Sequence, residues 1–335
     1  MTRQPARTEL STLGEFGLIA RLERILPRGL AKDWSVEIGD DCAVRRSSGG
    51  RSELLTQDLL FEGIHFLPGN SKHWETVGWK ALAVNLSDIA AMGGEPVGAV
   101  IGLGLPKRAK LGEVEALYRG LARAARRFSC PVVGGDTNRS RGAWTIAVTL
   151  LGETRRRPLL RGAARPGDSL WVTGELGGAA LAWRAEKKRK SVPASIRRRL
   201  LLPTPRLEWG RDLAAFGKVG AAIDLSDGLA GDLGHLAEVS GLGFEVELAA
   251  LPRPRGFAGL CAKVGVDVWG TLLEGGEDYE LLFTLRAGAE QAFGDYARRR
   301  GLKVACIGHA RQGSGIRWLE GGHEIRRRFG GFRHF

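Results

Sequence analysis

The sequence is poor in the features that mark secreted, membrane-spanning or zinc-binding proteins. Its four cysteines (Cys42, Cys130, Cys261 and Cys306) are scattered without a C-x-x-C pair. Neither a disulfide framework nor a zinc site is expected, and all four are interpreted as buried thiols. The first residues hold no apolar stretch of the kind that a secretory signal needs. The longest charge-free apolar run, residues 96–106, is too short to span a bilayer. We therefore expect a cytoplasmic protein without a membrane partner.

Two common nucleotide-binding signatures are also missing. No G-x-x-x-x-G-K-[ST] loop occurs, and GLGLPK (102–107) lacks the final glycine of a dinucleotide loop. The stretch VTGELGG (172–178) lies between an expected strand and an expected helix, where backbone amides can hold an anion. A plain turn is the simpler interpretation of that stretch.

Positive charge is in excess. The 50 Lys and Arg residues against 37 Asp and Glu give a formal net charge of +13, which is compatible with a nucleic-acid partner. No aromatic residues alternate with the basic clusters, as a base-stacking surface requires. We interpret the clusters as solvated faces and do not expect nucleic acid as a partner. They lie at 155–157, 184–190, 197–199, 298–300 and 326–328.

The chain of 335 residues, 43% of them hydrophobic, is long enough for about two domains. Helical periodicity predicts helices over residues 12–26, 73–92, 111–128, 177–190, 205–216, 229–239 and 287–300. Short apolar runs predict strands over 53–60, 98–106, 130–136, 144–153, 169–174, 221–226, 243–248, 278–285, 302–308 and 315–320. The strand over 98–106 is expected to be buried. The Gly/Pro/Arg stretch at 152–168 marks a boundary between two mixed α/β units.

Acidic residues recur beside glycine or small apolar residues in five stretches. Predicted strand ends or the inner face of a helix hold Asp40, Asp41, Asp58, Asp88, Asp136, Asp224 and Asp227. Carboxylates without histidine or thiolate are the ligands that Mg²⁺ prefers, and such an ion normally also binds water and substrate phosphates. Each aspartate alone is as readily a helix cap or an Asx turn. Their joint occurrence favours a metal-phosphate site.

Eight stretches along the chain resemble, in order, the thiamine-monophosphate kinase family, part of the superfamily of aminoimidazole ribonucleotide synthetase. They are GEFGLIARL (14–22), IGDDCAV (38–44), TQDLLFEGIHF (56–66), KALAVNLSDIAAMGGEP (80–96), VVGGDTNRS (132–140), ARPGDSLWVTG (164–174), AIDLSDGLAGDLGHLA (222–237) and EGGEDYELLFT (274–284). Single motifs among them are unspecific, but their common order and spacing cover nearly the whole chain.

The resemblance implies a fold and an activity. The fold is α/β (α+β), with mixed sheets flanked by helices: residues 1–153 bind ATP and Mg²⁺ and dimerise, and residues 154–335 form a second α/β domain. A homodimer would close a shared β-barrel from strands of the two N-terminal domains. The implied reaction is Mg²⁺-dependent transfer of the ATP γ-phosphoryl group to thiamine monophosphate, giving thiamine diphosphate and ADP. ATP is the co-substrate, and several Mg²⁺ ions take part.

The resemblance also assigns roles to residues. Metal ligands are Asp41, Thr56, Gln57, Asp58, Asp88, Asp136, Asp224 and Asp227, of which Asp58, Asp136 and Asp224 are catalytic. Gly135, Asp136, Arg161, Ser226 and Tyr118 contact ATP, and His65, Glu277 and Phe332 contact thiamine monophosphate. The family usually has Ser or Thr where this chain has Gln57, so that contact is made by an amide or a backbone carbonyl. Asp40 is interpreted as structural, and core roles stay open for Tyr118 and His65.

Two alternatives stand beside this interpretation. Other enzymes of the superfamily share the fold and the ATP site but not the acceptor. Selenophosphate synthetases carry a reactive residue near the N-terminus and the hydrogenase-maturation protein ends in cysteine, whereas here the first cysteine is Cys42 and the sequence ends in FRHF. An aminoimidazole ribonucleotide synthetase stays open but lacks support from GEFGLIARL. The second alternative is a non-catalytic nucleic-acid binder, for which the net charge of +13 is the only argument.

Overall fold

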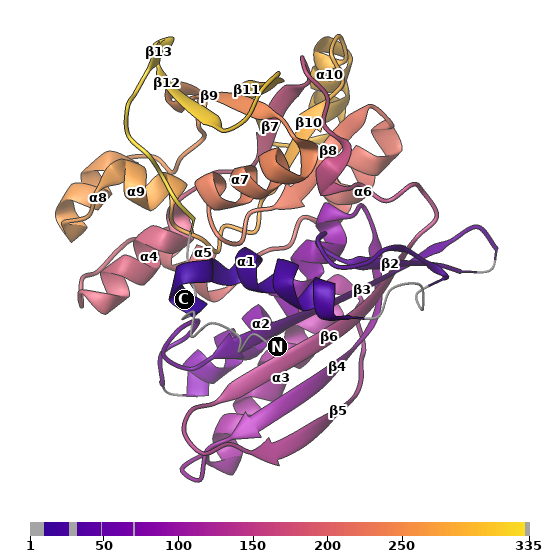
Figure 1. The fold of residues 1–335 in the computed structure, drawn as a ribbon. Helices are drawn as coiled ribbons and strands as arrows, with labels where there is room; N and C mark the ends of the chain where they lie inside the picture. Colours follow the sequence, from indigo (N-terminus) through magenta and orange to yellow (C-terminus); the bar gives the residue numbers. More distant parts are fainter. Residues whose placement is uncertain (1–9, 27–31, 48, 70, 332–335) are drawn as a thin grey trace, which may run out of the picture.

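Two mixed β-sheets, one in each half of the chain, build the molecule (Figure 1). The structure is a computed structural model, which describes residues 10–26, 32–47, 49–69 and 71–331, without the side chains of 10–16, 71 and 72. The mixed α/β fold predicted from the sequence is confirmed. The predicted domain boundary at 153/154 stays a prediction. No helix in the described ranges is long and apolar enough to cross a membrane.

The first sheet has the strand order β1-β2-β3-β6-β4-β5, with β4 and β5 parallel and the other pairs antiparallel. Its strands are β1 (Trp34–Val36), β2 (Ala43–Arg46), β3 (Ser52–Phe61), β4 (Glu95–Leu105), β5 (Val132–Arg139) and β6 (Thr145–Thr154). The helices of this half are α1 (Leu10–Ile25), α2 (Ser71–Ala91) and α3 (Leu111–Phe128). In Figure 1, α2 and α3 lie behind this sheet, and no helix covers its near face over β6, β4 and β5.

The second sheet has the order β13-β12-β9-β11-β7-β10-β8, with β12 and β9 parallel and the other pairs antiparallel. Its strands are β7 (Ser169–Thr173), β8 (Val219–Asp224), β9 (Gly243–Glu247), β10 (Leu281–Leu285), β11 (Val304–Arg311), β12 (Ile316–Glu320) and β13 (His323–Glu324). The α-helices are α4 (Gly178–Lys187), α5 (Ala194–Leu201), α6 (Leu207–Phe216), α7 (Leu229–Ser240), α8 (Phe257–Val264), α9 (Val268–Leu273) and α10 (Glu290–Arg300). Two 3-10 turns, η1 (Arg161–Ala163) and η2 (Leu248–Ala250), complete the second half.

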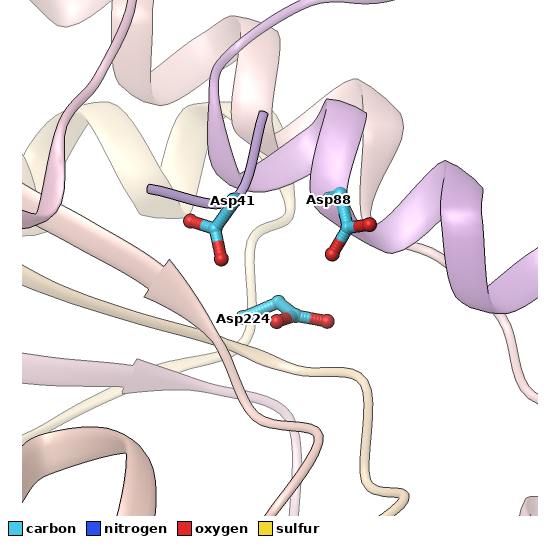
Figure 2. Close-up of side chains that lie close together, drawn as sticks. All are labelled: Asp41, Asp88 and Asp224. Atoms are coloured by element: carbon cyan, nitrogen blue, oxygen red, sulfur yellow. The ribbon is translucent and has the colours of Figure 1, made fainter. Parts of the chain in front are cut away.

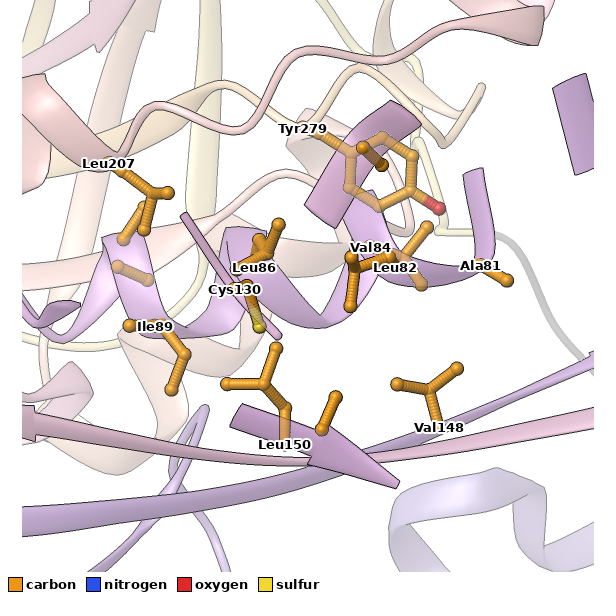
Figure 3. Packing of buried hydrophobic residues seen from close by; sticks show 14 of the residues in the cluster. Ala81, Leu82, Val84, Leu86, Ile89, Cys130, Val148, Leu150, Leu207 and Tyr279 are labelled. Atoms are coloured by element: carbon orange, nitrogen blue, oxygen red, sulfur yellow. The ribbon is translucent and has the colours of Figure 1, made fainter. Parts of the chain in front are cut away.

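Helix α2 lies between the two halves and is buried nearly all round from residue 80 to residue 91. Figure 3 shows Val148 and Leu150 of β6 on one side of this helix and Leu207 and Tyr279 from the second half on the other. A helix that is apolar all round belongs inside a core, which explains why the stretch KALAVNL has few charges. The helix ends where Gly93 takes a left-handed φ of +69°, as the Gly93-Gly94 pair predicts.

Most predicted elements are confirmed to within a few residues, and α3 covers residues 111–128 as predicted. The sequence did not reveal β1, β2, β13, α5, α8 or α9. All are short, eight residues or fewer, so none offers enough helical or strand periods for a clear pattern.

Two predictions about burial are wrong. Cys306 is exposed, whereas the other three cysteines are buried, because strand β11 alternates its side chains between the core and the surface. Residues 98–106 were expected to form a buried strand, but Val100 is 42% exposed on the uncovered face of the sheet. A sheet that packs helices on only one face leaves every second residue of its strands on the outside.

Candidate active site

A cavity of about 610 Å³ lies between the two halves of the chain. Its walls come from the loop before β2, from β3, from α2, and from the loops that follow β8 and α9. Most of the residues that the sequence predicted for the site line it: Asp41, Thr56, Gln57, Asp58, His65, Asp88, Arg161, Ser226, Asp224, Asp227 and Glu277. The fold therefore gathers side chains that are up to 236 positions apart, from residue 41 to residue 277.

Three carboxylates form the centre of this cavity (Figure 2). Asp41 comes from the loop before β2, Asp88 from α2 and Asp224 from the last residue of β8. Each offers one oxygen atom, and these atoms all lie within 4.8 Å of one another. The Oδ2 atoms of Asp41 and Asp224 are buried without a hydrogen-bond partner. Buried carboxylate oxygens without partners are costly, so the cluster has the chemistry of a cation site.

The protonation of the cluster is strongly perturbed. Burial, followed by the charge of Asp41, raises the pKa of Asp224 to about 8. Burial and the charges of Asp227 and Asp41 raise the pKa of Asp58 to about 6. The pKa of Asp88 lies well above its usual value because of burial and the neighbouring carboxylates, although a hydrogen bond from Thr56 opposes the rise. A bound cation would favour the ionised forms that burial and repulsion now disfavour.

Strand β3 and helix α2 supply the second group of oxygens. The Thr56 hydroxyl donates to Asp88 Oδ2 at 2.5 Å, and the backbone N–H of Asp58 donates to Asn85 Oδ1 at 3.1 Å. Asn85 and Asp88 lie on one face of α2, as their spacing predicts. Asp58 was predicted at a strand end but lies inside β3, seventh of its ten residues. That placement holds its carboxylate on a sheet backbone instead of a mobile loop end.

Arg161 is one of four basic residues that line the cavity, with Lys80, Arg184 and Lys187. Its guanidinium pairs with Asp41, and its backbone N–H donates to Asp40 Oδ2 at 3.1 Å. Burial opposes the charge of Arg161, but the carboxylate of Asp41 raises its pKa above the ordinary value. Asp40 also accepts the N–H of Asp41 through Oδ1 at 3.0 Å. Asp40 thus holds backbone groups, in agreement with the structural role expected for it.

A buried ion pair forms another part of the cavity wall. Lys80 of α2, only 4% exposed, pairs with Glu277 and donates to the backbone carbonyl of His65 at 2.9 Å. His65 Nδ1 accepts the N–H of Phe61 at 3.0 Å. The sequence motifs do not indicate Lys80. The one signal for it is a lysine inside the otherwise apolar stretch of α2, where a charge requires a partner.

The Glu277 loop is held in a strained conformation. Glu277 and Tyr279 have φ values of +71° and +50°, which non-glycine residues seldom adopt. Their N–H groups donate to the carbonyls of Ser226 and Leu225, both at 2.8 Å. Residues kept in unfavourable backbone conformations by surrounding hydrogen bonds cluster at functional sites. The two loops that carry Ser226 and Glu277 are therefore locked to each other.

Three predicted site residues lie elsewhere in the described structure. Gly135 and Asp136 are exposed on β5, and Tyr118 is 40% exposed on α3; none of them lines the cavity. Asp136 was expected at a strand end but is the fifth of eight residues in β5. Its cross-strand neighbour is Gly102, which places it on the uncovered face of the sheet. Phe332 lies outside the described residues.

The family models of AIR synthase related proteins match both halves of the chain. The N-terminal domain model matches residues 39–154 and the C-terminal domain model matches residues 165–318. The two models together cover most of the sequence.

Curated relatives of high similarity are thiamine-monophosphate kinases. The protein of Aquifex aeolicus is 37% identical over 311 residues, 92% of this chain and 94% of the relative. The protein of Salmonella typhimurium is 35% identical over 337 residues, 96% of this chain and 98% of the relative.

The chain is also similar to solved structures over nearly its whole length. A structure described as AaThiL complexed with AMPPCP and TMP is 34% identical, with a TM-score of 0.84, and the match covers 99% of this chain and 100% of that one. A structure of hydrogenase maturation protein HypE in complex with ATP reaches a TM-score of 0.67 at 19% identity, covering 91% and 93% of the two chains. The second match shows a shared fold alone.

Proposed function

Since the chain belongs to the thiamine-monophosphate kinase family, we propose that it transfers the γ-phosphoryl group of ATP to the phosphate of thiamine monophosphate. The products are thiamine diphosphate and ADP. One observation carries the proposal beyond family membership: the carboxylates of Asp41, Asp88 and Asp224, drawn from both halves of the chain, converge in one cavity. A reaction between two phosphates requires such a site, because the charge of both reactants must be neutralised before they approach.

The residues present fit Mg²⁺. Hard carboxylate oxygens and a threonine hydroxyl are the donors that this ion prefers, and two buried carboxylate oxygens of the cluster have no partner. Asp41, Asp88 and Asp224 would hold the ion, with Asp58, Asp227, Thr56 and Gln57 as further ligands. When bound, Mg²⁺ neutralises charge on the phosphates and on the carboxylates. Several ions are consistent with the number of carboxylates, and Gln57 contributes through its amide or its backbone carbonyl.

The remaining side chains position the reactants. Arg161, held by Asp40 and Asp41, points a fixed positive charge toward the phosphates of ATP, and Ser226 offers a hydroxyl on the same wall. Positioning and electrostatic stabilisation account for most of the rate in phosphoryl transfer. The attacking atom is a phosphate oxygen that is already ionised at neutral pH. No general base is required, and catalytic roles fall to Asp58 and Asp224.

The acceptor site lies at the Lys80–Glu277 pair. Lys80 fixes both the carboxylate of Glu277 and the backbone of His65, so these two residues form a rigid wall beside the carboxylate cluster. We assign this wall to thiamine monophosphate. Phe332 lies outside the described residues; we propose that its ring contacts the cationic thiazolium of thiamine monophosphate, an attraction known from other sites.

A homodimer would give a role to the predicted site residues that do not line this cavity. The uncovered face of the first sheet exposes large apolar side chains, namely Leu55, Leu59, Phe61, Val100 and Leu151. Such patches mark interfaces, and pairing of two sheets removes exposed strand edges. Asp136 lies on this face, and Gly135 and Tyr118 are also exposed, so we assign the contacts of these residues with metal and ATP to the cavity of a second copy. The shared β-barrel remains part of this proposal.

The dimer has a direct test. Val100→Arg combined with Leu151→Arg places two charges on the uncovered face without touching the cavity. Sedimentation equilibrium is expected to show a dimer for the parent protein and a monomer for the double variant. A monomeric parent protein at micromolar concentration would remove the dimer from the proposal.

We further propose that the protein works in the cytoplasm, where ATP and Mg²⁺ are supplied. Its functional units are residues 1–153, for metal, nucleotide and dimer contacts, and residues 154–335, which complete the cavity.

The activity is tested with purified protein, ATP, Mg²⁺ and thiamine monophosphate, followed by chromatography for thiamine diphosphate. Product that depends on all three additions supports the proposal. ATP consumption with another acceptor only, or none with thiamine monophosphate, would favour a sister enzyme of the superfamily. A salt-sensitive mobility shift with DNA or RNA in the absence of turnover would favour the nucleic-acid binder.

A further inference from the structure

A second cavity, away from the carboxylate cluster, is lined by arginines. It has a volume of about 470 Å³, and its wall includes five arginines: Arg155, Arg156, Arg157, Arg165 and Arg286. No carboxylate lines it among the described residues. An adjoining cavity of about 550 Å³ shares Arg157, Arg165 and Arg286 with it but also has Asp40 in its wall. We call only the first cavity, without a carboxylate, the arginine cavity.

Only one of these arginines is neutralised. Arg286 pairs with Asp168 at 2.7 Å and donates to the carbonyl of Ala163 at 2.9 Å. Within the described ranges, Arg155, Arg156, Arg157 and Arg165 form no ion pair with a carboxylate, although many other arginines of the chain do. Four unpaired positive charges around one concave surface repel one another and raise the local positive potential.

The arginines are brought there by the fold. Arg155 to Arg157 follow β6 of the first sheet, Arg165 follows η1, and Arg286 follows β10 of the second sheet. The cavity floor is apolar, with Leu159 and Leu213, and includes Gly220, where an added Cβ would overlap the Thr284 hydroxyl. These basic side chains come from three separate segments and surround one hollow. They are therefore not a run of solvated charges along a single helix. The volume lies in the range of small-molecule sites.

We propose that the arginine cavity binds a small molecule carrying two or more phosphate groups. The planar guanidinium group binds phosphate through two parallel hydrogen bonds and stays charged at all physiological pH values. A diphosphate matches the four unpaired charges, whereas a neutral or cationic ligand would leave them unopposed. The site is separate from the carboxylate cavity, whose acidic wall repels polyanions unless divalent cations are bound.

Segment η1 lies between the two cavities. Its first residue, Arg161, pairs with Asp41 in the carboxylate cavity, and its last residue, Ala163, lines the arginine cavity. A ligand held by Arg165 and Arg286 would therefore contact the segment that positions Arg161.

The test is isothermal titration of inorganic pyrophosphate into the purified protein at low ionic strength with EDTA. Without divalent cations we expect the carboxylate cavity not to bind the probe, because its clustered carboxylates repel polyanions. We expect one saturable event per chain. Replacing Arg155 and Arg157 together by Gln is expected to weaken binding by about tenfold or more, since each lost charge-assisted hydrogen bond costs about that factor.

The matched control is R326Q/R328Q, which removes two exposed arginines that line neither cavity. It is expected to bind pyrophosphate within about twofold of the parent protein. If circular dichroism shows that R155Q/R157Q does not fold, a third variant, R165Q, tests the proposal. R165Q is also expected to bind pyrophosphate more weakly than the parent protein. No saturable binding to the parent protein, unchanged binding in R155Q/R157Q and R165Q, or an equal loss in the control would each overturn the proposal.

Discussion

Lys80 and Asp58 show how single residues in this site depend on their neighbours. Lys80 is almost fully buried on a helix and forms an ion pair with Glu277. Asp58 is surrounded by other carboxylates, and burial raises its pKa to about 6. Removing one member of a buried ion pair leaves its partner uncompensated, whereas removing one of several repelling carboxylates relieves the others. The same type of substitution thus has opposite effects on stability at the two positions.

Asp58→Asn is expected to lower kcat on the order of 10²–10³-fold, the range found when one electrostatic contact to a transition state is removed. The metal-free variant should melt at a higher temperature than the parent protein at pH 8, because a repelling charge is gone. Steady-state kinetics and thermal unfolding by circular dichroism measure the two effects.

Asp212→Asn is the control for that substitution. Asp212 is a buried aspartate outside the cavity that pairs with Arg300 and accepts a hydrogen bond from Tyr296 at 3.1 Å. The Asp212→Asn variant is expected to be less stable than the parent protein and to have the same kcat. Parent-like turnover in Asp58→Asn would remove Asp58 from the catalytic set.

Glu277→Gln is expected to raise the KM for thiamine monophosphate by about tenfold, the cost of one charged hydrogen bond, with a smaller change in kcat. The buried charge of Lys80 then loses its partner, so the melting temperature should also fall. Kinetics at saturating ATP with varied thiamine monophosphate separate KM from kcat.

Glu175→Gln removes a carboxylate that pairs with Arg199 and is 42% exposed, outside the cavity. It is the matched control and should leave both constants unchanged. An unaltered KM in Glu277→Gln would place the acceptor elsewhere.

At the scale of elements, helix α2 organises the site. It carries Lys80, Asn85 and Asp88, and its position is set by close contact with α3. Two glycines permit that contact: a Cβ at Gly78 would overlap the carbonyl of Leu117, and a Cβ at Gly120 would overlap the carbonyl of Glu75. Both obstacles are backbone atoms, which cannot move aside without shifting a helix.

Gly120→Ala is expected to lower the free energy of unfolding by about 1–3 kcal/mol, the usual cost of overpacking a core, even though alanine favours helices. Gly112→Ala in the same helix is the control, because nothing lies within 4 Å of the Cβ that it would add. There the change should be neutral or stabilising by up to about 1 kcal/mol. Urea unfolding of both variants measures the difference, and equal stabilities would contradict the tight α2–α3 contact.

At the scale of the whole molecule, the carboxylate cluster links stability to pH and to Mg²⁺. The pKa values of Asp58 and Asp224 rise from the ordinary 3.8 to about 6 and about 8. The folded state therefore binds more protons than the unfolded state between pH 3.8 and these values. The stability that these two groups contribute is present at low pH and is lost as the pH rises through about 6 and about 8.

The melting temperature of the metal-free protein is accordingly expected to fall as the pH rises from about 6 to about 8. Saturating Mg²⁺ should flatten that decline, because the cation favours the ionised carboxylates in the folded state only. Scanning calorimetry with EDTA or with Mg²⁺ measures the slopes, and Asp224→Asn should show a weaker pH dependence without metal. Equal slopes with and without Mg²⁺ in the parent protein would argue against a cation at the cluster.

The sequence by itself determined most helices and strands, since periodic apolar residues show locally how each segment packs. It also determined the carboxylate chemistry, because Asp41, Asp88 and Asp224 are recognisable by their neighbours. Only the tertiary structure decided which residues share one cavity. Asp58 faces α2 and the cluster, whereas Asp136 lies on the opposite, uncovered face of the same sheet. The physical reason is that successive strand residues point to opposite faces, and the choice of face depends on packing between segments far apart in the chain.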